Sequence, residues 1–341
     1  MPSRRLRIGA FVALAGASGF AILCVGPGDA FDREPSRVSA NESMAEYEAR
    51  SGCEKQAMLW GEIERSRHAT RPPIPSFGAV ELLKMKTQGF RKKVRFVSDV
   101  APRGWVKYIH ARGSVAKVEW VEDPGAAAYS GLLRGARCGL LRLSLTYDPT
   151  ERGVAPGAAL KLFRDGHPSA NVSFLSSLQP QGQDYDFFRS SLSNVVPPWD
   201  DTGAKLVHWA FRRVSGYPET LAIRDLAAFG EDGRAIDAPR FPPQLFLVPK
   251  LRGRFDSAAH DVRDDFESLK AGTVLYEIRA VVAHPRGFNP DRYTEADRPR
   301  LEAESVRIGD LVLRSPFVSS EYGDTSLFFR HQTIDEPTEQ R

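Results

Sequence analysis

Residues Lys107 to Trp120 read KYIHARGSVAKVEW, and this stretch decides the fold prediction. In its second half, SVAKVEW, the apolar side chains of Ala116, Val118 and Trp120 share one face, and charged residues occupy the other. Such period-two alternation predicts a half-buried β-strand. His110 therefore stands where a strand begins. It is either a satisfied core histidine or a reactive group on a rigid edge.

The rest of the chain carries further strand signals with helical signals between them. Apolar residues at helical spacing predict helices in residues 56–65 and 77–90, and again in several runs across 184–229. Short strands are predicted in the following runs: 138–147, 159–166, 170–178, 243–253, 273–284, 310–318 and 326–332. The order predicts antiparallel β-structure with helices inserted midway, as in an α+β or barrel fold.

The composition is that of an ordinary globular protein and excludes several function classes. The chain has 341 residues, of which 42% are hydrophobic and 26% are charged. A net charge of +4, spread in mixed signs, does not indicate a nucleic-acid partner. The seven histidines show no HxxxH or HxH spacing, which argues against a zinc site. The chain has no G-x-S-x-G hydrolase motif.

The first thirty residues differ from the remainder. A basic start, MPSRRLR, precedes an apolar run rich in small residues, and Gly28 and Ala30 fit a cleavage site after position 30. Residues 1–30 are interpreted as a signal peptide or, if they are retained, an N-terminal anchor in which residues 8–25 form a membrane tether. Either interpretation predicts an exported protein, periplasmic or extracellular.

The domain prediction follows from these boundaries. Residues 31–55 are expected to be a polar tether, residues 56–335 a single barrel domain with N-terminal helices, and residues 336–341 a tail. Cleavage would remove Cys24 and leave Cys53 and Cys138. In an oxidising compartment these two could form a disulfide, and two separate thiols are equally compatible with the sequence.

Three segments resemble haem catalases, in the same order along the chain. HARG at 110–113 resembles the distal-histidine motif H-A-[KR]-G, and Arg142-Leu143-Ser144 resembles R-F-S. GAALKLFRDG at 157–166 resembles a shortened R-G-F-A-L-K-F-Y-T-x-x-G, and weaker similarity continues to about residue 331. The chain is identified as a small, divergent member of the catalase-like superfamily. The expected fold is an antiparallel catalase-like β-barrel with inserted helices.

The resemblance implies a haem b site and assigns roles to particular residues. His110 matches the distal acid/base that moves a proton between the two oxygens of a peroxide, a task that suits imidazole. Ser144 matches the hydroxyl that orients this imidazole, and Asn171 is the nearest candidate for the distal asparagine. Arg142 matches a contact to a haem propionate, which a guanidinium binds through two donors. Lys107 stands where the family has a second arginine.

The chain departs from the family at the iron ligand. Catalases hold the iron with a tyrosine on a helix after the last barrel strand, four residues after an arginine. The expected fold lacks this C-terminal proximal helix, because the chain ends soon after its last predicted strand. Tyr322, His331 and Tyr217, which follows Arg213 at the family's spacing, are the candidate ligands, and the metal ligand stays open.

Two functions are consistent with these observations. The first is haem-dependent metabolism of hydrogen peroxide or of an organic or lipid hydroperoxide, by a catalase, peroxidase or hydroperoxide isomerase reaction with His110 as acid/base. The alternative is a non-catalytic barrel that binds a lipid-like ligand and has a degenerate haem site. In that case His110 is retained only for packing in the core, and Ser144 is its hydrogen-bond partner.

Overall fold

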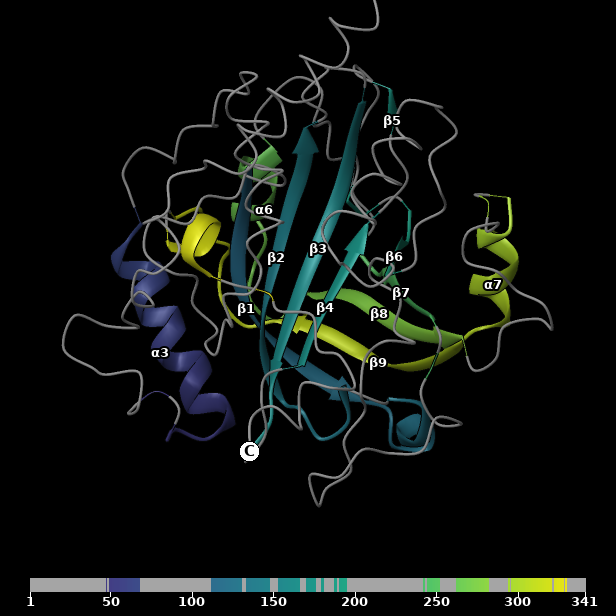
Figure 1. Ribbon diagram of the computed structural model, residues 1–341, viewed down its shortest axis with the longest axis horizontal. Helices are drawn as coiled ribbons and strands as arrows, with labels where there is room; N and C mark the ends of the chain where they lie inside the picture. The colour runs from purple at the N-terminus through teal and green to yellow at the C-terminus, as the bar shows by residue number, and fades with distance from the viewer. Residues whose placement is uncertain are drawn as a thin grey trace, which may run out of the picture.

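The computed structural model describes the following residues: 47, 49–67, 112–130, 133–147, 153–165, 170–175, 179–180, 187–188, 190–194, 242, 244–251, 262–281, 294, 296–320, 322–327 and 329. Their central feature is a closed antiparallel barrel of eight strands (Figure 1). The strands are β1 (Arg112–Glu122), β2 (Cys138–Tyr147), β3 (Gly153–Phe163), β4 (Ala170–Leu175), β6 (Leu192–Ser193), β7 (Gln244–Pro249), β8 (Val274–Val281) and β9 (Val306–Leu313).

The barrel consists of two four-stranded meanders. Strands β1 to β4 form the first and β6 to β9 the second, and the pairs β1–β9 and β4–β6 join them. A short strand, β5 (Gln179–Pro180), extends β3 outside the ring. Closure leaves the barrel strands without a free edge, which removes the aggregation risk of an open sheet.

Alternation along each strand separates the inside of the barrel from its outer face. Ala116, Val118 and Trp120 point inward, as their spacing predicts, and each is at most 3% exposed. They belong to one continuous core that spans both meanders and includes Leu141, Leu160, Phe174, Leu247, Ile278 and Leu311. An eight-stranded barrel is narrow enough for side chains to fill its interior.

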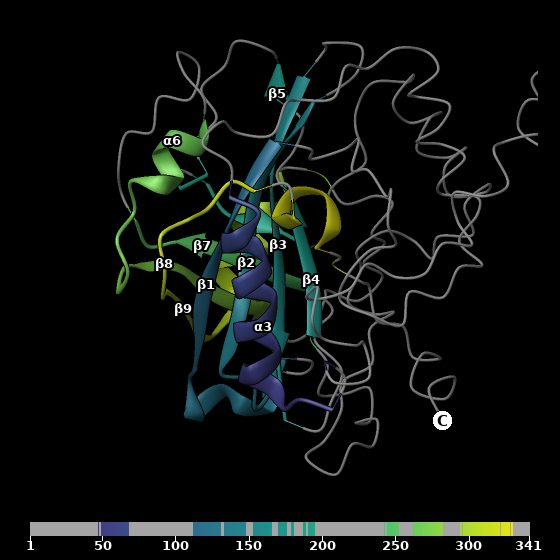
Figure 2. The same cartoon turned by 90° about the vertical axis from the view of Figure 1, so that its left-hand side faces the viewer.

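Helix α3 (Gly52–Arg65) lies along the outer face of the first meander (Figure 2). Ser51 and Glu54 form a capping box at its N-terminus. Nε2 of Gln56 donates hydrogen bonds to the carbonyls of Val118 (3.3 Å) and Gly139 (2.6 Å), which ties the helix to β1 and β2. The barrel domain was predicted to begin at residue 56, but α3, which packs on the barrel, begins at Gly52.

A disulfide between Cys53 and Cys138 joins α3 to the first residue of β2, with the Cα atoms 5.7 Å apart. The sequence had left this pairing open. Because the two cysteines are 85 residues apart in the chain, the bond closes a long loop.

Within the described part of the chain, three shorter helices lie between strands. They are η2 (Pro124–Tyr129), α6 (Val262–Glu267) and α7 (Arg298–Glu304). Asp123 caps η2 by accepting a hydrogen bond from the backbone of Gly125 at 3.0 Å. In the described ranges, no helix is both long and apolar enough to cross a membrane.

One secondary-structure prediction is wrong in the part of it that the structure describes. Residues 184–196 have helical spacing, but their described part contains a turn and then β6, where Leu192 pairs with Leu247 of β7. Of the strand predicted at 326–332, the structure describes three residues: Ser326 ends the π-helical turn η7 (Tyr322–Ser326), Leu327 forms a β-bridge, and Phe329 is in neither a helix nor a strand. The predicted helices at 77–90 and 204–229, the N-terminal segment and the tail lie outside the described residues.

Candidate functional site

The candidate site is the outer face of the strands β1 to β4. On β2, residues 141 and 143 face the core, so 140, 142 and 144 face outward. Cross-strand register aligns Arg142 with Val115 of β1 and Ala159 of β3. On the next strand, Lys161 pairs with Asn171. Arg142, Ser144 and Asn171, which the sequence selected, therefore share one face of the first meander.

Arg142 forms a buried ion pair with Asp324 of η7. Its Nε and Nη2 atoms donate to Oδ1 of Asp324 at 3.3 and 3.1 Å. The arginine side chain is 3% exposed and the aspartate side chain 2%. A guanidinium at this depth requires a carboxylate partner, because burial of an unpaired charge is strongly unfavourable.

Small residues surround this guanidinium on the side of β1. Ser144 pairs with Gly113 of β1 and with Gly157 of β3. A Cβ atom at position 113 would lie 2.6 Å from the carbonyl oxygen of Leu143 and 2.9 Å from Cζ of Arg142. Position 113 therefore has to be glycine for Arg142 to lie flat against β1.

Lys161 and Asn171 form a second buried polar pair on this face. Lys161 is fully buried. Its Nζ donates a hydrogen bond to Oδ1 of Asn171 at 2.7 Å. The same Nζ lies 5.5 Å from the centre of the Phe329 ring, within the range of a cation–π contact. Asn171 is 2% exposed, so this face holds its polar groups away from water.

The chain itself covers this face after its last barrel strand. We call the described residues between Tyr322 and Phe329 the C-terminal cover. Tyr322 donates its backbone N–H to Oγ of Ser66, just after α3, at 3.2 Å. The rings of Tyr322 and Phe329 pack against an apolar cluster that α3 and the outer face share. Its buried members are Tyr47, Leu59, Trp60, Ile63, Val115, Cys138, Leu140, Phe163, Val318 and Leu327.

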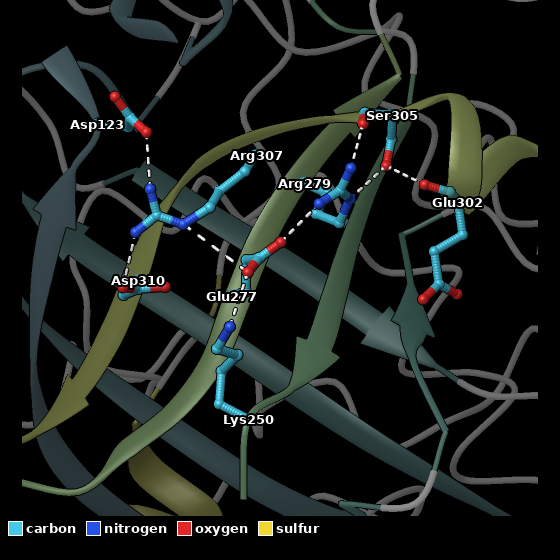
Figure 3. A network of polar contacts seen from close by, with 8 residues as sticks. All are labelled: Asp123, Lys250, Glu277, Arg279, Glu302, Ser305, Arg307 and Asp310. Carbon is cyan, nitrogen blue, oxygen red and sulfur yellow. Dashed lines mark hydrogen bonds and ion pairs between the residues drawn. The ribbon is translucent and has the colours of Figure 1, made fainter. Parts of the chain in front are cut away.

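The outer face of the second meander is different (Figure 3). There a network of charges lies at the surface, with Glu277 of β8 between Arg279, Lys250 and Arg307. Burial raises the pKa of Glu277, but hydrogen bonds from Arg279 and Lys250 outweigh it, so the net pKa lies below its usual value. Hydrogen bonding to Asp310 raises the pKa of Arg307. These charged groups neutralise one another, so the outer face of the second meander is a weaker candidate for a functional site than that of the first.

The other site residues that the sequence predicted lie either on the C-terminal cover or outside the described residues. Tyr322 lies on the C-terminal cover, close to Asp324 in the chain. His110, Lys107, His331, Arg213 and Tyr217 lie outside the described residues. Sequence reasoning missed Asp324, because a single acid in SSEYGDTSLFF carries no pattern that links it to Arg142. It also assigned no role to Lys161, which lies on the same face as Arg142.

In this arrangement the outer face does not fit a haem. The guanidinium suited to a propionate already holds Asp324, and Lys161 and Asn171 are hydrogen-bonded to each other beneath Phe329. We therefore derive no reaction step through a haem.

The fold and site together define an eight-stranded antiparallel barrel with one covered, partly polar outer face. A comparison with models of protein families found no match, and neither did a search of curated proteins. The functional argument therefore depends on the residues themselves.

Proposed function

We propose that this protein is an exported, catalase-related barrel that binds a largely apolar, carboxylate-bearing molecule on the outer face of β1 to β4. The observation that carries the proposal is Arg142, a guanidinium buried in that face and oriented toward a carboxylate. Arginine is the preferred partner for carboxylates because its planar fork presents several donors at once. The apolar cluster beside it would bury the body of such a molecule.

Two kinds of molecule share this chemistry. A long-chain fatty acid has one carboxylate and an apolar chain, and a haem has two propionates and an apolar ring. The packed interior of the barrel favours a ligand on the outer face over one inside. Export is supported by the disulfide between Cys53 and Cys138, since such bonds persist in oxidising compartments.

Titration of the purified protein with each probe tests the proposal. The probes are haemin, followed by its absorption spectrum, and a fluorescent long-chain fatty acid. We expect saturable binding of one of them, weakened by at least about tenfold in Arg142→Met/Asp324→Leu, which removes the carboxylate site without leaving an unpaired charge. Arg307→Met, on the other meander, is the matched control and should bind as the wild type does.

Saturable binding that survives the double substitution would contradict the role of Arg142. Saturable binding of neither probe, including to the variants with a displaced cover described below, would overturn the proposed function.

Haem-dependent peroxide metabolism with His110 as the acid/base is the second candidate, and it requires displacement of the C-terminal cover, because the covered face does not fit a haem. It is favoured by the common face of Arg142, Ser144 and Asn171, three residues selected through one resemblance. If haemin binds, His110→Ala should abolish peroxide turnover and leave most of the haemin bound. Unchanged turnover in that variant would contradict the assignment of His110.

A further inference from the structure

The C-terminal cover places a carboxylate of the chain itself in the proposed ligand site. Oδ1 of Asp324 accepts from two nitrogens of Arg142, and this is the arrangement that a ligand carboxylate would adopt. Leu327 packs in the adjacent apolar cluster, where the apolar body of a ligand would lie. The cover therefore presents one carboxylate beside apolar side chains, which is the chemistry proposed for the ligand.

The cover is attached in a way that permits exchange. It follows β9; an isolated bridge between Val318 and Val115 precedes it, and Leu327 within the cover also forms a bridge. Among the described residues of the cover, none belongs to the strand ladders that close the barrel. Release of the cover would therefore leave the ladders of the barrel intact.

The polar groups beneath the cover also argue against a purely structural role. A permanent cover could pair apolar side chains at lower cost, because a buried ion pair is often no more stable than a well-packed hydrophobic replacement. Arg142 is paired with Asp324 before the exchange and with the ligand carboxylate after it, so neither end state buries an unpaired charge.

We infer that the C-terminal cover is an internal competitive inhibitor of the outer face, in which Asp324 occupies the carboxylate position of the ligand. This inference rests on the proposed function. A ligand binds only to the fraction of molecules in which the cover is displaced, so its apparent affinity is reduced by that fraction. Loss of the cover's contacts should strengthen ligand binding without changing the ligand preference.

Gly323→Leu is the sharpest test, because it leaves both charges of the pair in place. A Cβ atom at position 323 would lie 3.0 Å from Cγ2 of Val115 and 3.2 Å from Oγ of Ser320, so a leucine would push the cover away from β1. Asp324→Asn is the second variant and removes the competing charge. Glu304→Gln changes an exposed carboxylate on α7 in the same way and is the matched control.

The two measurements are the affinity for haemin and for the fatty acid, and the rate of proteolytic cleavage after residue 320. We expect Gly323→Leu and Asp324→Asn to bind the preferred probe at least about tenfold more tightly than the wild type and Glu304→Gln. Cleavage should accelerate in both variants, and saturating probe should accelerate it in the wild type, where bound ligand displaces the cover.

Equal affinity in the wild type and the folded variants would overturn the inference and leave the proposed function standing. Ligand that protects the wild type from this cleavage would also overturn it, because the cover would then close over the ligand. If Asp324→Asn does not fold, the affinity of Gly323→Leu and the proteolysis of the wild type still test whether the cover competes with the ligand. Absence of binding in every variant would overturn the proposed function itself.

Discussion

Arg142 and Asp324 are 182 residues apart in the chain and form an ion pair in which both side chains are almost fully buried. The pair connects the middle of β2 to η7, beyond the last barrel strand. It is therefore both the centre of the candidate site and the main polar contact of the C-terminal cover.

The first prediction concerns the stability of this pair. Asp324→Leu removes the carboxylate but leaves the guanidinium buried, so the free energy of unfolding should fall by about 3–5 kcal/mol. In Arg142→Met/Asp324→Leu it should return to within about 1–2 kcal/mol of the wild type, because an apolar pair replaces the charged one. Urea unfolding followed by circular dichroism measures both values. Additive losses in the double variant would show that the two residues do not act as a pair.

The second prediction concerns the glycine beneath Arg142. Gly113→Ala would bring its Cβ within 2.6 Å of a backbone carbonyl, and we expect it to lower the free energy of unfolding by about 1–3 kcal/mol. Gly61→Ala in α3 is the matched control, since no atom lies within 4 Å of its added Cβ. It should stabilise the protein by about 0.5–1 kcal/mol, because alanine is the better helix former. A neutral Gly113→Ala would contradict the close packing of Arg142 on β1.

The third prediction concerns the disulfide. Cys53→Ala/Cys138→Ala should lower the free energy of unfolding by about 2–4 kcal/mol, because an 85-residue separation is no longer cross-linked in the unfolded chain. Reductant should lower the melting temperature of the wild type and leave that of the double variant unchanged. Equal sensitivity of the two proteins to reductant would show that the bond does not form.

The fourth prediction follows from the lowered pKa of Glu277. Burial raises this pKa, but the hydrogen bonds from Arg279 and Lys250 lower it more. A carboxylate with a lowered folded-state pKa stabilises the protein above its ordinary pKa, and this contribution is lost as the pH falls through the folded-state value. The wild type should therefore exceed Glu277→Gln in unfolding free energy at pH 7 by more than at about pH 3. A difference independent of pH would contradict the network in Figure 3.

Local pattern predicted the strands better than the elements around them. The run at 138–147 was predicted with the bounds of β2, because alternation along a strand is visible in the sequence itself. The helical spacing of 184–196 failed, because Leu192 finds a strand partner in β7 and tertiary pairing overrides local preference.

The sequence by itself determined the inward face of β1, where Ala116, Val118 and Trp120 alternate with charged residues. A family resemblance selected Arg142, Ser144 and Asn171, and the register of the barrel places them on one outer face. The sequence also determined that two cysteines are available outside the N-terminal segment. Only the tertiary structure decided that Cys53 meets Cys138, that Lys161 bonds to Asn171, and that Asp324 reaches Arg142. The physical reason is that period-two alternation is a property of neighbouring residues, whereas these contacts join strands and helices whose positions depend on how the whole barrel closes.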